Sequence, residues 1–158
     1  SSAALLDYVW NERKFYTKGS LNYVDGRDVA EAVFRLYKHP RPGERFILSA
    51  GSLPFKDFFE KVAGQLNKSA ASVRISPAVA YCAACLEELS AFFTGREPMV
   101  TRQSARLAQQ TFLFENKKAQ QVLGLQFRPL EETIAWCSED YLRNVKLNKQ
   151  KKQVAGRQ

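Results

Sequence analysis

The sequence predicts a mixed α/β chain in which helix dominates, and three observations support this prediction. Apolar residues recur at helical spacing in several segments that start with a capping residue. Short runs rich in β-branched and aromatic residues lie between these segments. The chain has 158 residues, of which 45% are hydrophobic and 25% charged, so it can form one domain with its own core.

Helices are predicted where apolar side chains recur three or four residues apart behind a capping residue. Asp28 is expected to cap one helix, with Glu31 completing a capping box, and Ser52 is expected to cap the next. Ser76 and Pro77 start the helix expected to be longest, because proline is tolerated in a first turn. In chain order, the expected helices cover residues 3–11, 28–39, 52–66, 77–94, 101–109, 116–124 and 129–144.

Strands are predicted where short apolar or aromatic runs are bounded by turn residues. Tyr23 and Val24 favour an extended backbone, and Lys18 and Gly19 turn the chain before them. The expected strands lie at residues 15–17, 21–25, 45–49, 71–75 and 111–114.

Three segments carry a resemblance to a known family. Residues 22–32 read Asn-Tyr-Val-Asp-Gly-Arg-Asp-Val-Ala-Glu-Ala and are followed by Gly-Glu-Arg-Phe-Ile-Leu at 43–48. Residues 114–119 read Phe-Glu-Asn-Lys-Lys-Ala, and residues 127–134 read Phe-Arg-Pro-Leu-Glu-Glu-Thr-Ile. In order and spacing they resemble the C-terminal half of an extended short-chain dehydrogenase/reductase. That family includes NAD-dependent epimerases and dehydratases and the dihydroflavonol-reductase-like enzymes.

The resemblance implies an α/β fold that is the C-terminal part of a Rossmann-type enzyme. Residues 1–144 would form its small, mostly helical substrate-binding portion, with elements around 21–50 completing the Rossmann sheet. The family's Gly-rich phosphate loop and Tyr-x-x-x-Lys pair do not occur in this sequence, so the N-terminal dinucleotide-binding half is expected to be missing. Residues 145–158 are predicted to be a flexible tail. Residues 142–158 contain six basic residues and no acidic one. Of the net charge of +8, they carry +6, and residues 1–141 carry +2.

The resemblance also implies what the intact protein does. Its parent would be an enzyme that moves a hydride between NAD or NADP and a small molecule bearing a carbonyl or hydroxyl group. This chain alone is expected to be inactive and to bind no cofactor. Leu21 stands where the epimerases usually have an arginine, which favours the reductase-like branch. No catalytic or metal-binding residue is predicted, and the residues expected to bind substrate are Tyr16, Asn22, Tyr81, Arg102 and Arg106.

A second hypothesis is a stand-alone binding or scaffold domain that docks to an acidic partner through its basic tail. The tail lacks interleaved aromatic residues, which argues against nucleic acid as the partner.

No apolar run is long enough to span a membrane. Three cysteines at no disulfide spacing favour a cytoplasmic location, and Cys82 and Cys85 are interpreted as small core residues within a helix. Half a Rossmann sheet would expose apolar faces, so self-association is expected.

Overall fold

The computed structural model of the protein describes residues 2–96 and 101–155. This part of the chain is mixed α/β and mostly helical, as predicted. The strands are β1 (Phe15–Tyr16), β2 (Ser20–Tyr23), β3 (Gly51–Pro54) and β4 (Val73–Arg74). The helices are α1 (Ser2–Trp10), α2 (Gly26–Lys38), α3 (Phe55–Leu66), α4 (Pro77–Thr94), α5 (Arg102–Leu107), α6 (Lys117–Leu123) and α7 (Leu130–Ala155).

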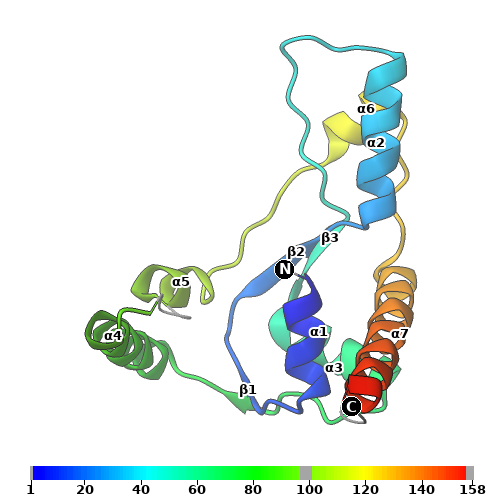
Figure 1. Ribbon diagram of the computed structural model, residues 1–158. Helices are drawn as coiled ribbons and strands as arrows, with labels where there is room; N and C mark the ends of the chain where they lie inside the picture. The colour runs from blue at the N-terminus through cyan, green and yellow to red at the C-terminus, as the bar shows by residue number, and fades with distance from the viewer. Residues whose placement is uncertain (1, 97–100, 156–158) are drawn as a thin grey trace.

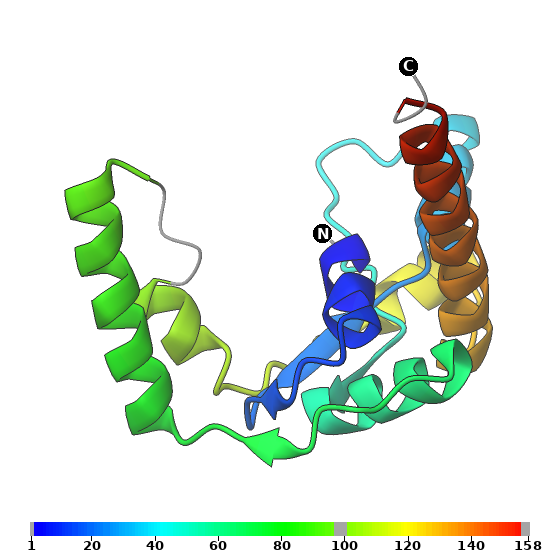
Figure 2. The same ribbon diagram turned by 60° about the horizontal axis from the view of Figure 1, so that its bottom comes forward.

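The helices form three groups around two small sheets. Figure 1 shows α2 beside α6 at the top, α1, α3 and α7 together at the lower right, and α4 with α5 at the lower left. Figure 2 shows the α4–α5 pair projecting away from the α1–α3–α7 group. None of the described helices combines the length and the apolar character that a membrane span requires.

Two cores hold these groups together. The larger lies under α3, whose Phe58, Phe59, Val62 and Leu66 are all buried, as the helical spacing predicts. It also contains residues of α1 and α7. The smaller core joins α2 to α6 and consists of Ala32, Ala119, Leu123 and Leu125.

Each sheet in the described residues has two strands. β1 pairs with β4 in parallel, and β2 pairs with β3 in antiparallel register. Leu21, Tyr23 and Leu53 of the β2–β3 sheet pack on the larger core. Because strand side chains alternate between faces, Asn22 and its cross-strand partner Ser52 lie on the opposite face.

The cap of α2 differs from the prediction. Asp25, and not Asp28, is the N-cap, and its side chain accepts a hydrogen bond from the Arg27 backbone N–H at 2.8 Å. Asp28 is instead buried in the first turn of α2, where it binds the Arg128 guanidinium and accepts a bond from the Arg128 backbone N–H. Both carboxylates therefore fix the start of α2 next to the start of α7.

Several predicted boundaries are also wrong. Ser52 lies within β3, and α3 starts behind Pro54 without a side-chain cap. Residues 45–49 and 111–114 form no strand, because a strand needs a partner and none of the described residues supplies one. α7 is the longest described helix and continues through Ala155, so the predicted tail boundary at 145 falls inside it.

Candidate functional site

Three of the five residues predicted to bind substrate come together at the α4–α5 pair. Tyr81 lies on α4, and Arg102 and Arg106 both lie on α5. Both helices have strong local start signals. Ser76 caps α4 by accepting a bond from the Val79 N–H, and Thr101 caps α5 through a capping box with Ser104.

Arg102 joins the two helices. Its backbone N–H and its side-chain Nε donate to the two carboxylate oxygens of Glu88, at 2.8 and 2.7 Å. The pKa of Arg102 is raised, first by a hydrogen bond with Tyr81 and then by Glu88. The same bonds to Arg102 lower the pKa of Glu88. Arg102 is thus already engaged within the protein, and we assign it a positioning role.

Arg106 is placed differently. It lines a small cavity of about 170 Å³ together with Pro77, Tyr81, Ala105 and Gln109. Gln109 also contributes to this wall, and its Nε2 is buried without a hydrogen-bond partner within the described structure. A guanidinium at a cavity suits an oxygen acceptor, such as a carbonyl, hydroxyl or anionic group.

A larger cavity adjoins this one and shares Ala105 with it. Its volume is about 560 Å³, within the range of small-molecule sites, and alanines make up much of its wall. Small side chains leave room between α4 and α5, which explains why a cavity remains where two helices pack. The full set of lining residues is Thr17, Ile75, Ala80, Ala83, Glu87, Ser104, Ala105 and Ala108.

Tyr16 and Asn22 do not reach these two cavities. Tyr16 packs against the larger core, and its neighbour Thr17, just after β1, lines the 560 Å³ cavity instead. Asn22 lines a separate cavity of about 230 Å³ with Ser49 and Phe114. The Asn22 Oδ1 is buried without a described partner, and so is the Ser52 Oγ across the sheet.

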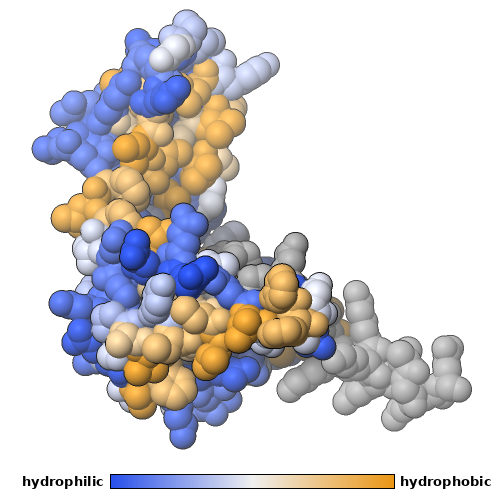
Figure 3. Space-filling model, turned by 90° about the vertical axis from the view of Figure 1, so that its left-hand side faces the viewer, coloured by the Kyte–Doolittle hydropathy of each residue, from blue (hydrophilic) through white to orange (hydrophobic). Residues whose placement is uncertain are grey.

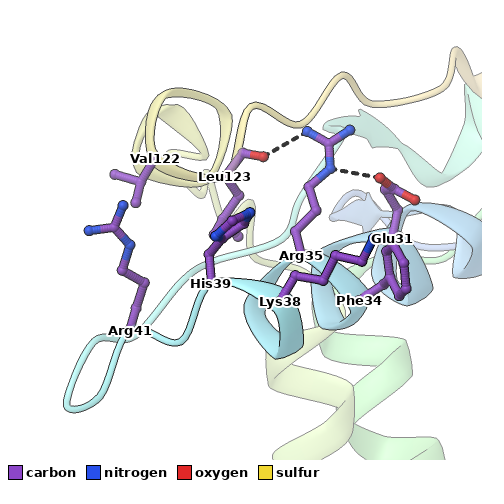
Figure 4. Close-up of a pocket in the computed structure, with 8 residues that line it drawn as sticks. All are labelled: Glu31, Phe34, Arg35, Lys38, His39, Arg41, Val122 and Leu123. Atoms are coloured by element: carbon purple, nitrogen blue, oxygen red, sulfur yellow. Dashed lines mark hydrogen bonds and ion pairs between the residues drawn. The ribbon is translucent and has the colours of Figure 1, made fainter.

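A fourth cavity, of about 360 Å³, lies between the C-terminal ends of α2 and α6. Figure 4 shows Arg35 at its centre, with Lys38, His39 and Arg41 around it. Arg35 donates to Glu31 and to the carbonyl oxygens of Leu123 and Gly124, each at 2.7 Å. These bonds satisfy carbonyls at the end of α6, so Arg35 is structural.

Gln109 is the residue that the sequence reasoning missed. It follows α5 without any motif around it, and its importance arises only because the chain folds back against Gly19 and Ser20. In the described residues, no three His, Cys, Asp or Glu side chains gather as a metal site.

Comparison with known proteins finds a similar fold among solved structures. No family model matches the sequence, and no curated protein matches it. A crystal structure of gox2253 is similar over 89% of this chain, with 26% sequence identity and a TM-score of 0.67. The match covers 42% of the gox2253 chain, so this chain spans less than half the length of that protein.

Proposed function

We propose that the chain is the substrate-binding portion of an NAD(P)-dependent oxidoreductase or epimerase that acts on a small molecule bearing a carbonyl or hydroxyl group. The observation that carries this proposal is the pair of adjoining cavities at α4 and α5. One is lined largely by alanines, and the other offers Arg106 and the unpartnered Gln109 Nε2. The class of enzyme comes from the motif resemblance over residues 22–48, 114–119 and 127–134.

The chain's own residues do not fit a dinucleotide. Clustered glycines are needed to hold a pyrophosphate against a helix start. The described glycines with positive φ are Gly43, Gly95 and Gly124, which lie far apart; Gly95 and Gly124 are helix C-caps. The proposal therefore assigns cofactor binding to a second half of the protein and derives no step through the cofactor here.

The segment 45–49 supports a missing second half. Phe46 and Leu48 pack on the smaller core, while Ile47 points away and is 51% exposed. No backbone hydrogen bond joins residues 45–48 to any other described residue. An extended segment with unpaired backbone groups and one apolar face is a template for another strand. A strand of the cofactor-binding half would satisfy these groups.

Within this proposal the residues have distinct roles. Arg106 and Gln109 would bind the polar oxygen of the substrate, and Arg102 would hold α5 against α4. The apolar cavity would bind the body of the substrate and exclude water from it. The chain would thus set specificity, while acid–base chemistry and hydride transfer would belong to the second half.

The proposal is tested on the protein that the native gene makes in its own cells. We expect an intact mass near twice the 18.0 kDa of this chain. We also expect quenching of protein fluorescence on addition of NADH or NADPH, and oxidation of one of them with a panel of aldehydes and ketones. An intact mass near 18.0 kDa without cofactor binding would overturn the proposal and favour a stand-alone binding domain.

Replacing Arg106 with alanine in that enzyme is expected to raise KM about 10-fold and leave kcat within a factor of two. A charge-assisted hydrogen bond to substrate contributes about 1.5–3 kcal/mol, and Arg106 has no partner among the described side chains. The melting temperature should therefore not change. Arg96→Ala, an exposed arginine just past α4, is the matched control and should change neither constant. An unchanged KM in Arg106→Ala would remove Arg106 from the site.

A further inference from the structure

α4 carries a regular apolar stripe on its exposed side. Val79, Cys82, Leu86, Leu89 and Phe93 follow one another at spacings of three, four, three and four residues. These spacings are those of the a and d positions of a heptad repeat, which places all five side chains on one face of the helix. The fractional exposures are 60% for Val79, 68% for Leu86, 55% for Leu89 and 78% for Phe93. Cys82 is also exposed, so its interpretation as a core residue is wrong.

The opposite face of α4 is the one that packs on the protein. Ala84 is fully buried and Ala91 is 7% exposed, and α5 is the neighbouring helix. Figure 3 views the molecule from the side on which α4 projects, and apolar side chains form a band across the lower part of that face. The stripe is therefore left without a partner in the described structure, although it has the pattern of a helix–helix seam.

We propose that this stripe pairs with the same stripe on a second copy of the chain. A sustained seven-residue repeat is the pattern by which one helix packs along another. A two-fold pair needs only a self-complementary surface, which a uniformly apolar stripe provides. The residues beside the stripe are uncharged, so two copies do not repel: Ala83, Cys85, Ser90 and Phe92.

The two glutamates of α4 do not oppose this pairing. Glu87 and Glu88 lie on the cavity side, where Glu87 lines the 560 Å³ cavity and Glu88 binds Arg102. Tyr81 and Ala83 also line the cavities and not the stripe. Pairing through the stripe therefore leaves the candidate substrate site open, and the inference does not depend on the proposed function.

The exposed area is sufficient for a dimer. Phe92 is 81% exposed and extends the stripe. Its ring packs edge-to-face against that of Phe93, with 5.7 Å between the ring centroids. Together these apolar side chains expose on the order of 600 Å², at the upper end for a monomer's largest patch. Two copies would bury at most about 1,200 Å² in total, which reaches the lower limit for a specific interface.

The test is the oligomeric state of the 158-residue chain by sedimentation velocity at about 20 μM. We expect the wild type to be a dimer and Leu86→Glu/Leu89→Glu to be a monomer, with a dissociation constant at least 100-fold higher. Both leucines are exposed and glutamate favours helix, so far-UV circular dichroism should not change.

Val33→Glu/Tyr37→Glu is the matched control, because it adds the same charge to an exposed apolar pair on α2. This variant should remain a dimer. A monomeric wild type would overturn the inference. So would a Leu86→Glu/Leu89→Glu variant that associates as strongly as the wild type, or dissociation of the control to the same extent, since the contact would then lie elsewhere or be nonspecific.

Discussion

Replacing Asp25 with alanine is expected to lower the free energy of unfolding by about 3–5 kcal/mol, because it breaks a buried ion pair and removes a helix cap. Asp25 is 1% exposed. One carboxylate oxygen accepts bonds from the Arg27 backbone N–H and Nε, and the other accepts from Arg27 Nη2 at 2.7 Å and from Thr133 Oγ1 at 2.9 Å. The substitution removes the shared acceptor of all four bonds, and only Arg27 Nη2, through Glu132, and Thr133 Oγ1, through the Pro129 carbonyl, keep another partner among the described residues.

The same carboxylate should make the protein sensitive to acid. Its hydrogen bond with the Arg27 side chain, followed by bonds from the Arg27 backbone and Thr133, holds the pKa of Asp25 well below its ordinary value of 3.8. A carboxyl whose pKa is lowered in the folded state contributes stability above its ordinary pKa and loses it as the pH falls toward the folded-state pKa. The wild type should therefore lose stability below about pH 4.

Urea unfolding at pH 7 and pH 3 measures both effects. Asp25→Ala should show a large loss at pH 7 and a smaller further loss on acidification than the wild type. Glu139→Ala is the control, since Glu139 is an exposed acid on α7, and it should behave as the wild type. If Asp25→Ala unfolds at the same urea concentration as Glu139→Ala at pH 7, the network does not stabilise the fold.

The Asp25 and Asp28 contacts show where sequence reasoning ends. Capping patterns are local, and they correctly indicated a helix start in this segment. The sequence, however, does not show that Arg128, one hundred residues later, binds Asp28. Without that contact, Asp28 looked like the cap, and the true cap Asp25 was assigned to the preceding strand.

The difference between local patterns and contacts distant in the sequence also explains the rest of the fold. Helices with a periodic apolar face and a glycine end were predicted well, and Gly95 and Gly124 adopt the left-handed C-cap conformation. The strands expected at 45–49 and 111–114 failed because pairing depends on residues elsewhere. Whether residues 21–50 complete a larger sheet stays a prediction.

The grouping of three predicted residues has a comparable reason, while their binding of substrate stays a prediction. Tyr81, Arg102 and Arg106 were chosen from helix positions, and two consecutive helices that pack bring such positions together. Tyr16 belongs to a strand, where a shift of one residue reverses the face, and the cavity residue is Thr17. Gln109 depends on a contact with the turn before β2, which no local pattern indicates.

The turn before β2 packs closely against the segment after α5, which makes Gly19→Ala the second substitution with a large expected effect. A Cβ at position 19 would lie 2.4 Å from the Ala108 carbonyl oxygen and 2.8 Å from that of Gln110. Both are backbone atoms, so the segment after α5 must shift. The Gly19 N–H bond to Ala108 and the Ser20 N–H bond to Gln110, at 3.1 and 3.3 Å, would be lost with it. We expect a loss of about 2–3 kcal/mol in unfolding free energy.

Hydrogen exchange can distinguish a local effect of Gly19→Ala from a general destabilisation of the protein. Hydrogen exchange of the amides of residues 19 and 20 should accelerate far more than that of the α3 amides, because the change separates the α4–α5 pair from the turn before β2. Gly64→Ala is the matched control, since a Cβ there meets no atom within 4 Å and Gly64 lies inside α3. It should stabilise the protein by about 1 kcal/mol through helix propensity. Equal exchange at residues 19 and 20 in Gly19→Ala and the wild type would show that this close approach does not hold the candidate site in place.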